Sequence, residues 1–215
     1  MKLSEQLKTA RFIGIMRRIP QEKILLCAEA FVAGGGEFLE ITFDPSDSET
    51  LRRTGDAVRA VKRSFPRLHV GCGTVLNISM TDAAADAGAE FIVSPAASEA
   101  VIKAAHRREI SAIPGAYTPN EILNAYGSGA DLVKLFPVLP GGERYVKTVM
   151  SPLSHIPFLV TGGVVLSTVR SMLDTGAAAV GAGASVFLPE LVERGDADGI
   201  SGLVSAFLKE IAHGG

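Results

Sequence analysis

Short apolar runs alternate with longer amphipathic stretches along the chain, and the alternation repeats about eight times. Runs of four or five apolar residues are typical of buried strands, whereas apolar residues spaced three and four apart indicate helices that pack on one face. A repeated strand and helix predicts βαβ units and a parallel sheet. The expected strands are Phe12–Met16, Phe38–Thr42, His69–Gly73, Phe91–Ser94, Ser111–Pro114, Leu132–Phe136, Phe158–Thr161 and Ala179–Ala182.

The stretches between these runs carry helix start and stop signals. A cap residue and a first-turn proline open Thr118-Pro119-Asn120-Glu121, and glycine closes other stretches at Gly88, Gly127 and Gly176. The Gly34-Gly35-Gly36 run precedes a strand, so we expect a helix end and a turn there and no dinucleotide-binding fingerprint. The expected helices are a short N-terminal one, Gln21–Ala33, Ser48–Ser64, Ser79–Ala87, Glu99–Arg107, Pro119–Tyr126, Glu143–Met150, Ser167–Asp174 and Ile200–Ile211.

Two folds share this rhythm, a (β/α)8 barrel and a doubly wound open sheet. An open sheet concentrates its site at one switch point, whereas a barrel builds its site at the C-terminal ends of many strands. Polar residues or glycine end nearly every expected strand, which favours an α/β fold of the (β/α)8 TIM-barrel type in one domain over residues 1–215. These residues are Arg17, Glu40, Thr42, Thr74, Ser94, Gly115, Lys134, Thr161 and Gly183.

Composition narrows the class of partner. The chain has 21 Lys and Arg against 23 Asp and Glu and no concentrated basic stretch, which argues against nucleic acid and anionic membranes as partners. No apolar stretch is long enough to span a membrane, and Cys27 and Cys72 belong to no CxxC motif, so we expect a cytoplasmic protein that binds a small molecule. Metal catalysis is not expected, because the histidines are scattered at His69, His106, His155 and His213.

Lys134 is the most informative residue, because it is a lone cation within an apolar expected strand. A buried lysine is costly unless its amine is neutral, and a neutral amine is a nucleophile that forms Schiff bases with carbonyl groups. The alternative is a lysine at a strand end that reaches solvent and pairs with Asp131. Glu40 changes the balance: it also lies in an apolar strand, and strand alternation places it on one face with Thr42. A carboxylate beside a Schiff-base lysine can move the protons that the reaction requires.

Glycine-rich segments follow three further strands. Gly71-Cys72-Gly73-Thr74-Val75 permits close approach of a ligand to the backbone and leaves the Thr74 hydroxyl free to bind a carboxylate. The segments Thr161-Gly162-Gly163-Val164 and Gly181-Ala182-Gly183 follow the last two strands, where barrels of this kind frequently bind phosphate. The alternative is that these glycines only allow tight turns.

Five ordered motifs resemble the family of 2-keto-3-deoxy-6-phosphogluconate (KDPG) and 4-hydroxy-2-oxoglutarate (KHG) aldolases. The resemblance covers the chain roughly from Ile13 to Leu188. The motifs are Leu39-Glu40-Ile41-Thr42, Gly71-Cys72-Gly73-Thr74-Val75, Ile113-Pro114-Gly115 with Thr118-Pro119-Asn120-Glu121, Val133-Lys134-Leu135-Phe136-Pro137 and Thr161-Gly162-Gly163-Val164.

The resemblance implies a homotrimeric class I aldolase, a carbon–carbon lyase that needs no cofactor. Such an enzyme cleaves a 2-keto-3-deoxy sugar acid phosphate, or 4-hydroxy-2-oxoglutarate, to pyruvate and an aldehyde (glyceraldehyde 3-phosphate or glyoxylate). It also implies that Lys134 forms the Schiff base and Glu40 shuttles protons. The substrate-binding residues implied by the motifs and by the strand-end glycines are Arg17, Thr74, Pro114, Phe136, Thr161, Gly162, Gly163 and Gly183.

Two departures from the family pattern concern the substrate. Many members carry Thr-Leu-Arg-Thr after the strand-two glutamate, and that arginine helps to hold the substrate carboxylate, but this chain has Thr42-Phe43-Asp44-Pro45. Either Arg17 takes over the carboxylate or the substrate differs. A family serine that reaches phosphate is Ala184 here, with Ser185 one position later.

Two alternative functions stay open at the level of the sequence. One is a non-catalytic or regulatory barrel that binds a phosphorylated sugar, and the other is a different phosphate-handling barrel enzyme, because a fold alone does not fix a function. The presence of both Lys134 and Glu40 favours the lyase.

Overall fold

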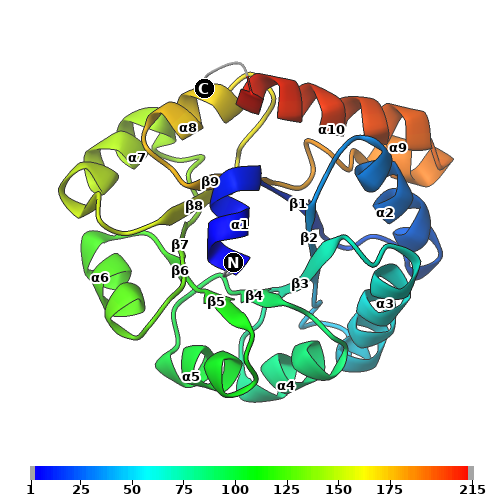
Figure 1. Cartoon of the computed structure of the whole chain (residues 1–215), viewed down its shortest axis with the longest axis horizontal. Coiled ribbons are helices and arrows are strands. Elements are labelled where there is room, and N and C mark those ends of the chain that lie inside the picture. The colour runs from blue at the N-terminus through cyan, green and yellow to red at the C-terminus, as the bar shows by residue number, and fades with distance from the viewer. Residues whose placement is uncertain (1–2, 213–215) are drawn as a thin grey trace.

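The computed structural model describes residues 3–212 as an α/β barrel of parallel strands enclosed by a ring of helices (Figure 1). Parallel pairing throughout follows from the strand and helix alternation, because each helix returns the chain to the same edge of the barrel. The strands are β1 Phe12–Met16, β2 Phe38–Thr42, β3 His69–Gly73, β4 Phe91–Val93, β5 Ser111–Ile113, β6 Gly115–Ala116, β7 Val133–Leu135, β8 Phe158–Thr161 and β9 Ala179–Ala182.

The helices follow the expected pattern with small shifts of their ends. Thr118 caps the start of α6 and Pro119 lies in its first turn, as the sequence predicts, and Glu121 completes a capping box with Thr118. The helices are α1 Leu3–Ala10, η1 Gln21–Lys23, α2 Ile24–Ala33, α3 Thr50–Ser64, α4 Ile78–Asp86, α5 Glu99–Arg107, α6 Pro119–Gly127, α7 Gly142–Met150, η2 Ser151–Leu153, α8 Val169–Asp174, α9 Pro189–Arg194 and α10 Ala197–Ala212. The short helix α9 was not predicted, and the expected helix Gln21–Ala33 begins with a 3-10 turn.

The expected strand Ser111–Pro114 is two strands, β5 and β6, separated by Pro114. Proline has no N–H to donate, so it interrupts the ladder. β5 pairs with β4 and β6 pairs with β7, so this split strand joins the two ends of the strand order and nearly closes the barrel. The Lys134 N–H donates to the Pro114 carbonyl at 2.8 Å and continues the pairing past the break.

Two apolar layers hold the barrel together. The outer layer lies between strands and helices, and the inner layer fills the barrel with side chains such as Ile13, Phe38, Phe91 and Leu159. Helix α1 lies across the middle of the barrel in Figure 1, and its Leu7 side chain is buried in the inner layer. The interior is therefore packed at one end, which leaves the C-terminal ends of the strands as the place for a cavity.

Candidate active site

The main cavity lies at the C-terminal ends of the strands and has a volume of about 820 Å³. Its walls come from the ends of β1, β2, β3, β7, β8 and β9, so segments far apart in the sequence meet in one site. Nine of the ten residues proposed from the sequence line this cavity: Arg17, Glu40, Thr74, Lys134, Phe136, Thr161, Gly162, Gly163 and Gly183. Pro114 is the exception, since it does not line the cavity and contributes through its backbone carbonyl to strand pairing.

Lys134 occupies the middle of β7, and only 8% of its surface is exposed. Burial lowers the pKa of its amine below the ordinary lysine value, the Glu40 carboxylate acts against that shift, and the Arg17 guanidinium adds to it. The Nζ atom lies 4.7 Å from the centroid of the Phe136 ring. Lys134 therefore presents an amine with a reduced proton affinity to the cavity.

Glu40 lies on β2 and is 1% exposed. Burial raises the pKa of its carboxyl above the ordinary value, and the nearby charges of Lys134 and Arg17 oppose that rise. Its Oε2 atom is buried and has no hydrogen-bond partner among the described residues. A buried oxygen without a partner is costly in a purely structural residue, which makes Glu40 a candidate functional group.

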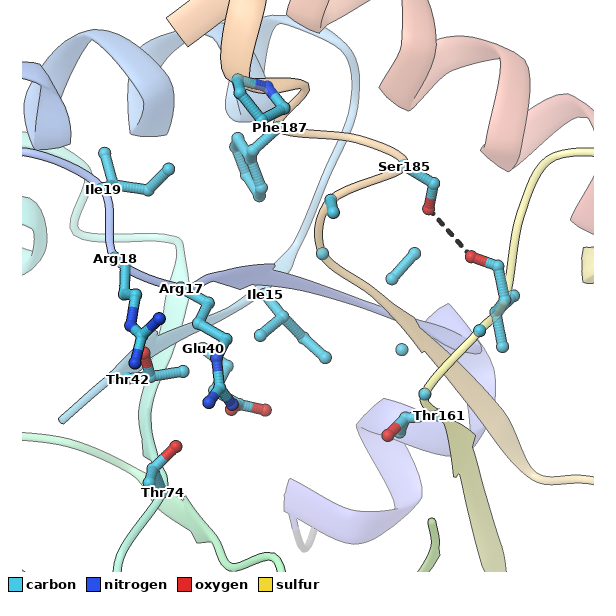
Figure 2. Close-up of a pocket in the computed structure, with 18 of the residues that line it drawn as sticks. Ile15, Arg17, Arg18, Ile19, Glu40, Thr42, Thr74, Thr161, Ser185 and Phe187 are labelled. Carbon is cyan, nitrogen blue, oxygen red and sulfur yellow. Dashed lines mark hydrogen bonds between the residues drawn. The ribbon is translucent and has the colours of Figure 1, made fainter. Parts of the chain in front are cut away.

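Arg17 directly follows β1 and acts electrostatically on both buried groups, because it lowers the pKa of Glu40 and of Lys134. Figure 2 shows its guanidinium beside the Glu40 carboxylate. An arginine keeps its charge at every relevant pH. The lysine, the glutamate and Arg17 thus form one coupled electrostatic group.

The segments after β8 and β9 form the other side of the cavity. A Cβ on Gly162 would lie 2.7 Å from the Phe136 ring, and one on Gly163 would lie 2.7 Å from the Leu139 side chain. Both glycines also have positive φ angles, so they are needed for the close approach of the segment that follows β7. The Ser185 hydroxyl donates to the Val164 carbonyl at 2.8 Å (Figure 2), which ties the two segments together.

Several lining residues were not proposed from the sequence. Thr42 lines the cavity with Glu40, and the strand alternation predicted that shared face. Ile15 and Pro95 lie near the ends of β1 and β4, but they are neither polar residues nor glycine, so the signal used for the proposed residues did not identify them. Arg18 could not be found in this way, because strand alternation would direct it away from Arg17.

The remaining sequence expectations concern metals and membranes. Among residues 3–212 no group of three or more His, Cys, Asp or Glu side chains is placed to hold a metal ion, and His213 lies outside the described residues. Within the same range no helix has the length and apolar character needed to cross a membrane.

Comparison with known proteins identifies the group to which this barrel belongs. A family model described as KDPG and KHG aldolase matches residues 3–203. The 2-dehydro-3-deoxy-phosphogluconate aldolase of Pseudomonas aeruginosa is 32% identical over 190 residues, which are 88% of this chain and 84% of that protein. The KHG/KDPG aldolase of Escherichia coli K12 is 33% identical over 177 residues, 82% of this chain and 80% of that protein.

Solved structures agree with the sequence matches. A KDPG aldolase from Legionella pneumophila, with pyruvate captured as a covalent carbinolamine intermediate, has a TM-score of 0.84 at 26% identity and covers 94% of this chain and 97% of its own. A structure described as native KDPGal has a TM-score of 0.82 at 27% identity and covers 94% of each chain. The fold and the relatives together identify the protein as a carbon–carbon lyase of the class I aldolase type. Within that class, the chain belongs to the KDPG and KHG aldolase family.

Proposed function

We propose that Lys134 is the Schiff-base nucleophile and Glu40 the proton shuttle of an aldolase that releases pyruvate from a 4-hydroxy-2-keto acid. The observation that carries this proposal is the pairing of a buried amine of lowered pKa with a buried carboxyl of raised pKa in one cavity. Transfer of one proton between the two groups leaves their net charge unchanged. The pair can therefore exchange a proton without placing an additional charge in the buried site.

The chemistry follows from these two groups. The neutral Lys134 amine attacks the C2 ketone to give a carbinolamine. The protonated Glu40 carboxyl donates its proton to the departing hydroxyl, which leaves as water, so that an iminium ion and a Glu40 carboxylate result. Glu40, as a carboxylate, accepts the proton of the C4 hydroxyl while the C3–C4 bond breaks and its electron pair moves into the iminium, which leaves an aldehyde and the enamine of pyruvate. Protonation of the enamine at C3 and hydrolysis then release pyruvate and restore the lysine.

The candidate substrates are a 2-keto-3-deoxy sugar acid phosphate, which gives glyceraldehyde 3-phosphate, and 4-hydroxy-2-oxoglutarate, which gives glyoxylate. Support comes from the family and from the cavity volume of about 820 Å³, which falls within the range for small-molecule sites. In this proposal Thr74 binds the keto-acid carboxylate, Phe136 shapes the pocket, and Gly162 and Gly163 bind the phosphate. Thr161 and Gly183 complete the wall, and Pro114 acts only through the position of Lys134.

The proposal extends to a homotrimer in the cytoplasm. The two buried free thiols are consistent with a reducing compartment. Exposed apolar side chains such as Leu139, which is 74% exposed, offer surface for contact between copies. Light scattering at several protein concentrations tests the trimer.

Borohydride trapping tests the catalytic assignment. Protein incubated with pyruvate and borohydride is expected to carry one reduced adduct, located on Lys134 by peptide mapping. The variant K134A is expected to form no adduct and to release no pyruvate from either candidate substrate, whereas K147A, which removes an exposed lysine of α7, is expected to behave as the wild type. Pyruvate release by K134A at the wild-type rate, or an adduct on another lysine, would refute the proposal.

A further inference from the structure

Two residues of the cavity wall have strained backbones. Among residues 3–212, four non-glycine residues have positive φ angles: Arg11, Arg18, Thr74 and Glu109. Arg11 and Glu109 directly follow residues at the ends of α1 and α5, where left-handed conformations are common. Arg18 and Thr74 follow strands instead, and both line the main cavity. The positive φ angles of Arg18 and Thr74 are therefore not explained by a helix end. Backbone strain of this kind in a cavity wall indicates a functional role.

The strain at Arg18 has a specific geometric consequence. Along β1 the side chains alternate, so Ile15 lines the cavity and Met16 packs in the outer apolar layer. Arg17 lines the cavity again, and a continued strand would direct Arg18 to the outside. The φ angle of +55° at Arg18 ends that alternation. Figure 2 shows both arginine side chains extending in the same direction, Arg17 to Glu40 and Arg18 to Thr42.

The two arginines differ in the ion pairs that they form. Arg17 acts electrostatically on Glu40, Lys134 and Asp44, whereas Arg18 forms an ion pair with Asp44, whose Oδ2 lies 3.7 Å from the Arg18 Nε atom. Asp44 is itself held by Ser46, whose N–H and hydroxyl donate to its Oδ1 atom at 3.0 and 2.7 Å. These bonds also keep the pKa of Asp44 below its ordinary value, so it remains an anion that anchors Arg18.

Arg18 lies between the main cavity and a smaller one of about 440 Å³, and Asp44 lines only the smaller one. The Arg18 side chain is 69% exposed, so its remaining donors are accessible from the main cavity. Thr42 and Thr74 line the same cavity as Arg18, and Figure 2 shows all three residues on the side of the cavity where Glu40 lies. The exposed Arg18 guanidinium and two hydroxyl-bearing residues therefore line the Glu40 side of the cavity.

We propose that Arg18 is a substrate-binding residue that holds the carboxylate of the 2-keto acid, together with Thr74. This inference rests on the proposed function, since a 2-keto acid carries its carboxylate on the carbon that Lys134 attacks. Arg17 acts electrostatically on Glu40 and Lys134, and Arg18 binds the substrate carboxylate, so the two adjacent arginines have separate roles. Asp44 supports the reaction by positioning Arg18.

The test compares a charged ketone with a neutral one. The readout is the concentration of pyruvate, or of methyl pyruvate, that half-saturates borohydride trapping on Lys134. In R18Q the half-saturating concentration of pyruvate is expected to rise by about tenfold or more, the size of a lost charged hydrogen bond, whereas that of methyl pyruvate is expected to stay unchanged. R18K keeps the charge and is expected to restore most of the pyruvate affinity.

Two further variants separate binding from folding. R18G removes the charge and relieves the positive φ angle, so it is expected to melt no lower than the wild type while it binds pyruvate as poorly as R18Q. R53Q removes an arginine that lines only the smaller cavity, where it pairs with Asp47, and is expected to leave both ketones unaffected.

Three outcomes would overturn the inference or its basis. Unchanged half-saturation by pyruvate in R18Q would assign the carboxylate to another residue. An equal rise for pyruvate and methyl pyruvate would show a structural effect alone. Absence of an adduct in the wild type would refute the proposed function as well, which distinguishes that failure from the other two.

Discussion

Gly73 lies so close to Glu40 that a Cβ atom on Gly73 would be 1.7 Å from the Glu40 Oε1 atom. The two residues are on neighbouring strands, β3 and β2, and the glycine leaves the space that the carboxyl group occupies. The side chain of Glu40 therefore owes its position to the absence of a side chain on the next strand. The flanking residue of the same motif, Gly71, has another purpose, since a Cβ there would lie 2.3 Å from the Phe91 ring.

The variant G73A is expected to lose activity because the added methyl group must displace the Glu40 carboxyl. Displacements of about 1 Å at a reacting group can cost about a hundredfold in rate. Overpacking of the buried site is also expected to lower the free energy of unfolding by about 1–3 kcal/mol. Steady-state kinetics and urea denaturation measure the two effects.

G202A is the matched control, because a Cβ at Gly202 in α10 meets no atom within 4 Å. It is expected to retain full activity and to gain about 0.5–1 kcal/mol, since alanine favours a helix over glycine. Full activity in G73A would show that the position of Glu40 is not required for turnover.

The strained backbone of Thr74 leads to a second prediction. A β-branched residue at a φ angle of +57° is a genuine outlier. T74G is therefore expected to raise the free energy of unfolding by about 1 kcal/mol, while loss of the hydroxyl weakens substrate binding and raises KM. E109G relieves a similar φ angle of +58° at the end of α5 and is expected to stabilise the protein without a change in KM. Equal KM values for T74G and the wild type would exclude a binding role for the Thr74 hydroxyl.

The two thiols are expected to be inert in the folded protein. Both Cys27 and Cys72 have no exposed surface, and burial raises the pKa of Cys27 to about 11 and that of Cys72 further. Since the thiolate is the reactive form, neither reacts at neutral pH. Ellman's reagent at pH 8 is expected to modify no thiol in the native protein and two per chain in guanidinium chloride. Prompt modification of the native protein would show that these thiols are accessible.

Much of the fold could be predicted, because buried parallel strands are short apolar runs with clear ends. The bounds of β1, β2, β3, β8 and β9 match the expected ones. The break at Pro114 was not foreseen, although proline's missing N–H predicts such a break once the strand is known to lie in a closed ladder. Helix α9 has only six residues, too few for a helical period to be recognised.

The site was predictable where chemistry alone identified it and not where conformation did. Lys134 and Glu40 stood out as charges in apolar strands, and both line the cavity. The sequence around an arginine does not indicate a left-handed φ angle, so Arg18 was not identified as a lining residue although it neighbours Arg17. The departure at Asp44 becomes intelligible only in three dimensions, since this carboxylate pairs with Arg18.

The lowered pKa of Lys134 predicts that its contribution to the free energy of unfolding rises with pH. In the unfolded chain the lysine pKa is about 10.4, so between the folded and unfolded values the unfolded state holds a proton that the folded state lacks. Unfolding then takes up a proton, and this contribution to the free energy of unfolding rises with pH until about pH 10.4. It is smallest below the folded pKa, where the buried amine must be charged.

We expect to see this slope by comparing E40Q with E40Q/K134M, because the glutamine removes the titration of Glu40 from both proteins. As the pH rises from 7 to 10, the stability of E40Q is expected to improve relative to E40Q/K134M by about 1.4 kcal/mol for each unit by which the folded pKa is lowered, up to the width of the pH range. Urea denaturation at four pH values measures the difference. Parallel stability curves would mean that Lys134 titrates with its unfolded pKa in the folded protein, and its nucleophilic amine would then require another source of activation than burial.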